Sequence, residues 1–188
     1  MDLFFCTLLF AAGIYLGYTS SSFEAMLDNQ LQGLGEMVKQ IEAQPHAELM
    51  FFVVIFLNNS IKALIVMVAG VFFGIVPAIF LVMNAMVLGY VFHKGLDNGH
   101  SLGDLLLAIV PHGIIELPAL ILAAAVGMRL GMLALRRTVR SFGPPTRQRE
   151  SIVRPYFKRI MPVAVVIVIA LFVAAVVEST ITPWLIGM

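Results

Sequence analysis

The composition of this chain is far from that of a soluble globular domain. Hydrophobic residues make up 60% of its 188 residues and charged residues only 12%, and the mean hydropathy is +0.97. This balance is typical of a multi-pass membrane protein with one membrane domain. The net charge of +1 hides an asymmetry, because nine of the twelve Lys and Arg residues lie between Arg129 and Arg159, where Glu150 is the only acid.

The first 48 residues predict one short span followed by an external segment. Residues 3–18 form an apolar run near the lower length limit for a spanning helix, and the cationic region of a signal peptide is missing. We therefore expect a retained helix, with Gly13 and Gly17 in a close helix contact. Residues 19–48 are polar, with five acidic residues against one lysine, and their apolar residues recur at three- and four-residue steps. This pattern predicts an amphipathic helix that covers the bundle mouth or binds a partner.

Residues 49–92 contain one full charge and predict two spans, at 49–69 and 75–92. The turn between them should fall near Gly70, Gly74 and Pro77, whose backbone preferences suit a break. Asn58, Asn59 and Asn84 come out near mid-bilayer, while Lys62 lies deeper toward the turn. The simplest interpretation of Lys62 is a side chain that snorkels toward the turn side.

The apolar run 105–127 is interrupted near its middle by residues that a spanning helix usually avoids. These are Pro111, His112, Gly113, Glu116 and Pro118. His112 and Glu116 share a helix face at i, i+4, and in hydrocarbon they need polar partners on other helices or water. The prolines remove backbone donors, so we expect the helix to bend or break there.

A basic segment and a final span complete the chain. Residues 129–159 predict a cytoplasmic loop whose first part continues as an interfacial helix, with Arg129, Arg136 and Arg140 against lipid headgroups. The last span is expected at 160–184, with Glu178 late in it. By the positive-inside rule the N-terminus is cytoplasmic and the C-terminus external. The expected fold is therefore an all-α transmembrane bundle of about five spans.

The sequence predicts one set of residues that forms a polar cluster and a second set that breaks or packs the helices. The intramembrane polar cluster is expected to comprise Asn58, Asn59, Lys62, Asn84, His112, Glu116 and Glu178. The expected break and packing positions are Gly70, Gly74, Pro77, Gly89, Pro111, Gly113, Pro118, Gly127 and Gly131. Aligning Asn59 with Glu116 also aligns Gly70 with Gly127 and Gly74 with Gly131. This alignment suggests a weak parallel repeat.

The order of these motifs resembles the stage II sporulation protein M family. The resemblance rests on Asn58-Asn59, Gly70, Gly74, Pro77, Asn84, Gly89, Pro111-His112-Gly113, Glu116-Leu117-Pro118-Ala119 and Glu178. Its most specific part is Pro-His-Gly-x-x-Glu. The resemblance implies a multi-pass membrane protein and, from the sporulation member, a membrane anchor for peptidoglycan-remodelling partners.

Several functions are weighed against these residues. A zinc protease helix carries the motif His-Glu-x-x-His, whereas this chain has His112-Gly-Ile-Ile-Glu116. A serine protease needs a serine nucleophile beside a base, and Ser60 is the only intramembrane candidate. We therefore expect no catalytic residue, metal or cofactor, and no nucleic-acid partner. A scaffold that binds membrane or envelope proteins is preferred, and a small transporter or proton- or cation-linked channel is the alternative. The sequence is also compatible with a homo-oligomer.

Overall fold

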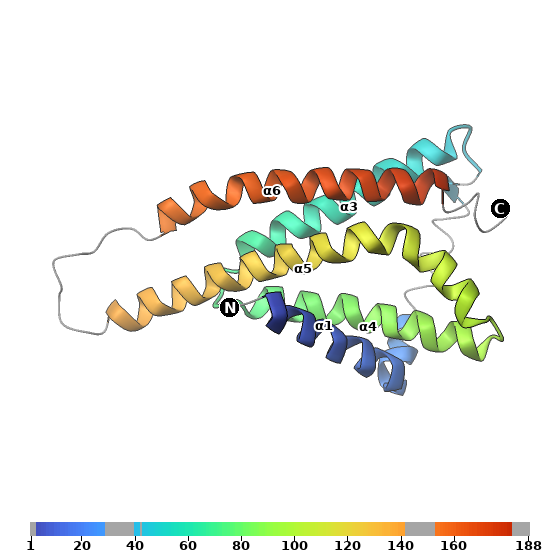
Figure 1. Cartoon of the computed structure of the whole chain (residues 1–188), viewed down its shortest axis with the longest axis horizontal. Coiled ribbons are helices and arrows are strands. Elements are labelled where there is room, and N and C mark those ends of the chain that lie inside the picture. Colours follow the sequence, from blue (N-terminus) through green and yellow to red (C-terminus); the bar gives the residue numbers. More distant parts are fainter. Residues whose placement is uncertain (1–2, 29–39, 42, 142–152, 182–188) are drawn as a thin grey trace.

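The computed structural model describes residues 3–28, 40–41, 43–141 and 153–181. In chain order these residues form α1 (Leu3–Thr19), a short helix Ser21–Asp28, α3 (Ala47–Ala69), α4 (Ile75–Asp97), α5 (Leu102–Ser141), α6 (Val153–Val176) and a π-helical turn, η1 (Val177–Ile181). The long helices lie roughly along one direction (Figure 1). The described residues include no strand, so this part of the chain is an all-helical bundle.

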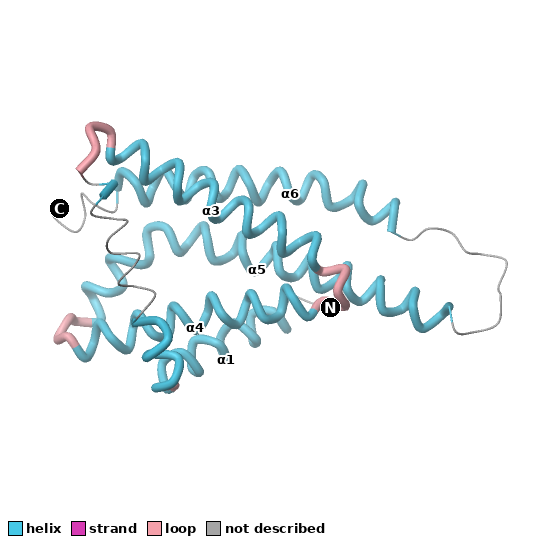
Figure 2. The backbone as a smooth tube through the Cα atoms, turned by 180° about the vertical axis from the view of Figure 1, so that it is seen from behind, coloured by secondary structure: helices cyan, strands magenta, loops and turns pink. Residues whose placement is uncertain are grey.

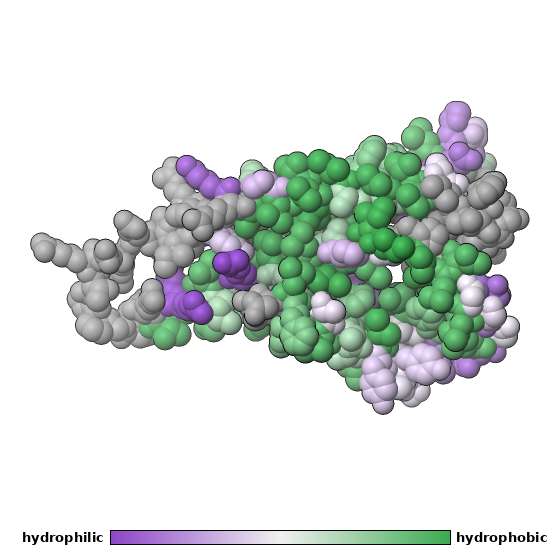
Figure 3. Space-filling view, viewed as in Figure 1, coloured by the Kyte–Doolittle hydropathy of each residue, from purple (hydrophilic) through white to green (hydrophobic). Residues whose placement is uncertain are grey.

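Within the described residues, four helices are long and apolar enough to cross a membrane. They are Ala47–Ala69, Ile75–Asp97, Gly113–Val139 and Ile160–Thr180. A fifth span is counted only if α1 is joined to Ser21–Asp28, which is bent from it by 80°. The visible face of the bundle is largely apolar, with hydrophilic residues gathered toward its ends (Figure 3). The chain is therefore a multi-pass membrane protein.

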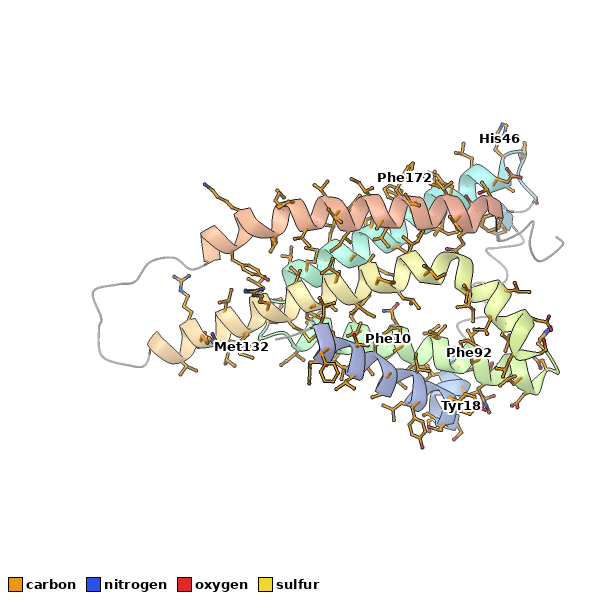
Figure 4. All side chains as sticks on the ribbon, in the orientation of Figure 1. Phe10, Tyr18, His46, Phe92, Met132 and Phe172 are labelled. Carbon is orange, nitrogen blue, oxygen red and sulfur yellow. The ribbon has the colours of Figure 1, made fainter. Side chains whose placement is uncertain are left out.

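α5 lies at the centre of the bundle. It packs against α3, α4 and α6, while α1 packs chiefly on α4. Ala63 and Met67 of α3 form one core with Ala123 of α5 and Ile167 of α6. A second core joins α1 to α4, where Phe10, labelled in Figure 4, belongs to one buried cluster with Leu81 and Ala85.

α5 is bent, but its backbone is helical throughout. Helix runs from Leu102 to Ser141 through Pro111, Gly113 and Pro118, and the part that meets the length and hydropathy of a span begins at Gly113. Figure 1 shows the bend where the ribbon colour passes from lime to yellow. Prolines that delete backbone donors favour such a bend.

Two helix ends follow from local sequence chemistry. Ser101 precedes α5 and exchanges hydrogen bonds with Asp104: the Asp104 N–H donates to Ser101 Oγ at 3.2 Å, and the Ser101 N–H donates to Asp104 Oδ2 at 3.1 Å. This is a capping box. The turn between α3 and α4 places Phe73 and Gly74 at φ of 56° and 77°. Glycine adopts this left-handed region without strain.

The helices extend beyond several of the bounds predicted from sequence. α4 continues to Asp97, α5 begins at Leu102 and runs to Ser141, and α6 begins at Val153. The basic region 129–159 begins with the helical continuation that was expected beyond Gly127, and its second described part, from Val153, is helical where a loop was expected. The reason for the α5 extension is packing, because Met128 and Leu130 are buried against the rest of the bundle. Residues 142–152 and 182–184 lie outside the described residues.

Candidate functional site: an intramembrane polar pair sealed by glycines

Asn59 of α3 and Glu116 of α5 form a hydrogen bond between the two helices. The Asn59 amide Nδ2 donates to Glu116 Oε1 at 3.0 Å, and both side chains are partly buried. The Asn58 amide donates in turn to Asn59 Oδ1 at 3.3 Å. Hydrogen bonds to a carboxylate are stronger than those between neutral groups. The Asn59–Glu116 bond therefore ties α3 to α5, and the Asn58 amide holds the Asn59 side chain from within α3.

The polar pair lies near the middle of the span. Asn59 precedes Gly70, at the end of α3, by eleven residues, which corresponds to about 16 Å of helix. A hydrocarbon core is about 30 Å thick, so this depth is close to its centre.

Below the pair, α3 and α5 touch backbone to backbone. A Cβ atom on Gly70 would lie 1.9 Å from the Gly127 carbonyl oxygen, and one on Gly131 would lie 2.0 Å from the Gly74 nitrogen. A Cβ on Gly127 would lie 2.7 Å from both the Pro77 ring and the Val66 carbonyl. Only glycine permits this approach, and the contact closes the space between α3 and α5.

The positions that the sequence alignment equates are therefore in contact. Asn59 meets Glu116, Gly70 meets Gly127, and Gly74 meets Gly131, each pair separated by 57 residues. α3 and α5 run in the same direction (Figure 1). The alignment thus describes two parallel helices packed in register.

The other predicted members of the cluster do not all join this pair. The Asn84 amide donates to the Phe80 carbonyl of its own helix at 2.8 Å. Asn58 and Lys62 are exposed on α3. Glu178 is partly buried on η1, which packs against α3 and α5. Ser60 is buried, and its hydroxyl makes no hydrogen bond within the described residues.

Some predicted residues fall outside what the structure describes. The backbone of Pro111 and His112 is helical, but their side chains are not among the described ones, and the same holds for Arg140. Within the described residues, no three His, Cys, Asp or Glu side chains form a group that could hold a metal ion.

The predicted lipid-facing arginines lie on the part of α5 beyond Gly127. Arg129 and Arg136 are exposed there.

Nearby, the Tyr156 hydroxyl of α6 donates to the Val126 carbonyl of α5 at 2.7 Å. Burial raises the pKa of Tyr156, and the neighbouring Arg129 guanidinium opposes this rise. The hydrogen bond ties the start of α6 to α5 at the level of Gly127.

Glycines also allow α1 to pack closely on α4. A Cβ on Gly17 would lie 1.9 Å from the Met86 carbonyl oxygen, and one on Gly89 would lie 2.0 Å from the Ile14 carbonyl oxygen. A Cβ on Gly13 would lie 2.6 Å from the Ala85 Cβ. Gly89 therefore serves the packing of α1 on α4 rather than the α3–α5 contact.

A second polar group, which we call the latch, was not foreseen from the sequence. It comprises Glu24 and Asp28 of the short helix and Tyr90 and Lys94 of α4. The Lys94 ammonium lies 2.9 Å from Glu24 Oε1 and 3.4 Å from Asp28 Oδ2, and the Tyr90 hydroxyl donates to Asp28 Oδ1. Phe23 and Leu27 pack against Tyr90 beneath these bonds. The sequence feature that could have indicated the latch was a lone lysine at the end of α4, together with an acidic amphipathic segment elsewhere in the chain.

The latch should hold the short helix on α4. Replacing Lys94 by methionine removes both ion pairs, so we expect faster amide hydrogen exchange across Ser21–Asp28 and unchanged exchange in α3. Asp97→Asn is the matched control, because Asp97 pairs with His93 at the same end of α4 and makes no hydrogen bond or ion pair with the described short helix. Equal exchange in the two variants would contradict a holding role.

The latch should also depend on pH in a defined direction. The Tyr90 hydroxyl, followed by the Lys94 ammonium, lowers the pKa of Asp28 from its ordinary value of 3.8. A lowered carboxyl pKa stabilises the bound state fully above the ordinary value, and this contribution is lost as pH falls through the lowered pKa. Protection of Ser21–Asp28 should therefore persist at neutral pH and fall only in acid below 3.8.

Comparison with known protein families identifies the family of this chain. The family model for stage II sporulation protein M matches residues 6–183. The chain belongs to the stage II sporulation protein M family. The match includes α3, α4 and α5, which carry the Asn59–Glu116 pair and the Gly70–Gly127 contact of this family member.

One curated relative is similar to about two thirds of this chain. It is an uncharacterized protein of Methanocaldococcus jannaschii, 32% identical over 127 residues, which cover 66% of this chain and 52% of the relative. The chain thus matches about half the length of this relative. No solved structure matches the chain.

Proposed function

We propose that this family member is a non-enzymatic membrane scaffold that anchors partner proteins of the membrane or cell envelope. The observation that carries the proposal is that the Asn59–Glu116 hydrogen bond lies above the backbone contact of Gly70 with Gly127. A proton or ion relay needs a path from its carboxylate to both surfaces. Between Glu116 and the inner end of the bundle, backbone contact fills the space between α3 and α5.

The polar pair is then a packing element. Interhelical hydrogen bonds in membranes contribute roughly 1 kcal/mol each, and glycine contacts add close van der Waals packing. Together they fix the position of α3 relative to α5. A rigid bundle of this kind suits a platform for other proteins.

The decisive substitution is Glu116→Gln, which keeps the shape and hydrogen-bonding capacity but removes the titratable proton. If the protein is a scaffold, purified wild type and Glu116→Gln should give equal, background-level proton and cation flux in proteoliposomes. Both should also co-purify the same membrane proteins in mild detergent. A flux present in wild type and lost in the folded Gln variant would instead establish the channel or transporter alternative.

The proposed orientation places the N-terminus in the cytoplasm and the C-terminus outside, because the nine basic residues beyond Gly127 favour the cytoplasmic side. A cysteine at Ser21 should react with a membrane-impermeant thiol reagent in intact cells, and one at Ser141 should be shielded. The reverse pattern of labelling would invert the proposed topology.

A further inference from the structure

Lys62 has no counter-ion in the described bundle. It is exposed on α3, one helical turn after the exposed Asn58, and its neighbours Ile61 and Ile65 are 52% and 58% exposed. None of the ion pairs among the described residues involves Lys62. Glu116, the acid on α5 nearest to it in register, accepts the hydrogen bond from Asn59.

The ammonium of Lys62 is too deep to reach the inner membrane surface. Lys62 precedes Gly70 by eight residues, or about 12 Å of helix. The turn beyond Gly70 is itself apolar, with Val71, Phe72 and Phe73 exposed by 47%, 64% and 50%, so it extends the hydrocarbon-facing surface. A four-carbon lysine stem cannot cover that distance, which makes snorkelling a poor account of this residue.

Lys62 lies on the side of α3 that faces toward α4. Val66, one turn further along α3, belongs to the same buried cluster as Leu81 and Ala85 of α4. Residues at i and i+4 share a helix face, so Lys62 lies one turn above the α3 residue that joins this cluster. α3 and α4 touch little along their lengths, and α5 lies between them in the view of Figure 2.

We call this region the α3–α4 face. It comprises Asn58, Ile61, Lys62 and Ile65 of α3 with Met83 and Asn84 of α4. Ile61, Ile65 and Met83 are exposed apolar side chains, and Met83 is 37% exposed. Asn58 is exposed and Asn84 partly exposed. The face therefore combines an apolar surface with one cation and two amides near the same depth.

We propose that the α3–α4 face binds a transmembrane helix of a partner protein, and that this helix carries an Asp or Glu carboxylate at the depth of Lys62. A charge in hydrocarbon is costly unless it is paired, and a membrane-embedded carboxylate is the group that pairs with an ammonium. Asn58 and Asn84 offer further hydrogen bonds to polar atoms of the same helix. The inference rests on the scaffold function proposed above and names the chemistry of the partner.

The other occupants fit these observations less well. Lipid phosphates lie at the surface, about 12 Å from Lys62 along the helix. A second copy would have to supply Glu116 or Glu178, and both are partly buried within their own bundle. A partner helix is therefore favoured by charge complementarity at this depth.

The test uses synthetic transmembrane peptides as partners of known chemistry. Polyleucine helices with a single central Glu, Gln or Lys are reconstituted with the full-length protein in vesicles, and binding is measured by fluorescence energy transfer. Wild type should bind the Glu peptide at least about tenfold more tightly than the Lys peptide, because close charge pairs at interfaces show coupling of that size or larger. Lys62→Glu should reverse the preference, and Lys62→Met should abolish it.

A matched control separates a specific site from general charge attraction. Val166→Glu places a carboxylate on an exposed position of α6, 59% exposed, while Lys62 is retained. This variant should keep the preference of wild type for the Glu peptide. Melting in detergent verifies that each variant is folded, and the Lys62→Met variant serves if Lys62→Glu does not fold.

Three outcomes would overturn the proposal. The first is an absence of preference between the Glu and Lys peptides in folded wild type. The second is reaction of a Lys62→Cys variant, made with Cys6 replaced by alanine, with a membrane-impermeant thiol reagent, which would show a water-filled face. The third is efficient disulfide cross-linking of that variant to itself, which would identify a second copy. None of these outcomes would change the result of the flux test, so failure of this proposal can be told apart from failure of the scaffold function.

Discussion

Replacing Gly131 by alanine should destabilise the bundle strongly. The new Cβ would lie 2.0 Å from the Gly74 nitrogen and 2.4 Å from the Phe73 carbonyl carbon, so the α5 helix must move away from the turn. Both contacting atoms are backbone and cannot rotate aside. Overpacking typically costs about 1–3 kcal/mol, and a backbone clash belongs at the upper end of that range. We expect a clear drop in the detergent melting temperature.

The same helix supplies the control for this prediction. Among the described side chains, a Cβ on Gly113 would meet nothing nearer than Ile109 and Leu117 at 3.6 Å, which is ordinary contact. Alanine also favours helix over glycine by about 1 kcal/mol. Gly113→Ala should therefore leave the melting temperature unchanged or raise it slightly. If the two variants melted alike, the close approach of α3 and α5 would not be a source of stability.

Replacing Glu116 by leucine should have the second large effect. The substitution leaves the Asn59 amide, now donating at 3.0 Å to Glu116 Oε1, without this acceptor in a low-dielectric region. An unsatisfied polar group of this kind costs about 1–3 kcal/mol. Glu116→Gln keeps an acceptor oxygen at the same position and should cost less. Detergent melting of the two variants measures the difference.

A double substitution shows whether the cost arises from this hydrogen bond. The double variant Asn59→Leu with Glu116→Leu removes both partners and leaves no unsatisfied amide. Its loss of stability should therefore be smaller than the sum of the losses of the two single variants. Strict additivity of the two losses would mean that Asn59 and Glu116 stabilise the fold independently.

Much of the fold was predictable because membrane helices are defined by local sequence. Runs of apolar residues fix α3 and α4, and the turn falls between Gly70 and Gly74, where left-handed φ values are needed. The bend in α5 follows from prolines that delete hydrogen-bond donors. The ends of α4, α5 and α6 were less predictable, because burial of residues such as Met128 and Leu130 extends α5 past the glycine that was expected to end the span.

The candidate site was predictable in part. Asn59 and Glu116 stood out because polar groups in hydrocarbon need partners, and their matching positions before two Gly-xxx-Gly motifs indicated helices of related register. Asn84 showed the same local signal, but its amide donates to the Phe80 carbonyl of its own helix. Nothing local distinguishes these two asparagines, since the outcome depends on which neighbouring helix lies opposite each one.

The sequence by itself determined that this protein lies in the membrane, which segments are helical there and which polar residues are costly, because hydropathy and backbone preferences act over a few residues. Only the tertiary structure decided that Asn59 pairs with Glu116, that Gly70 lies against Gly127, and that Lys94 holds Glu24 and Asp28. These contacts join residues 57 to 70 positions apart. They depend on the register between whole helices, which is set by close packing of many side chains at once.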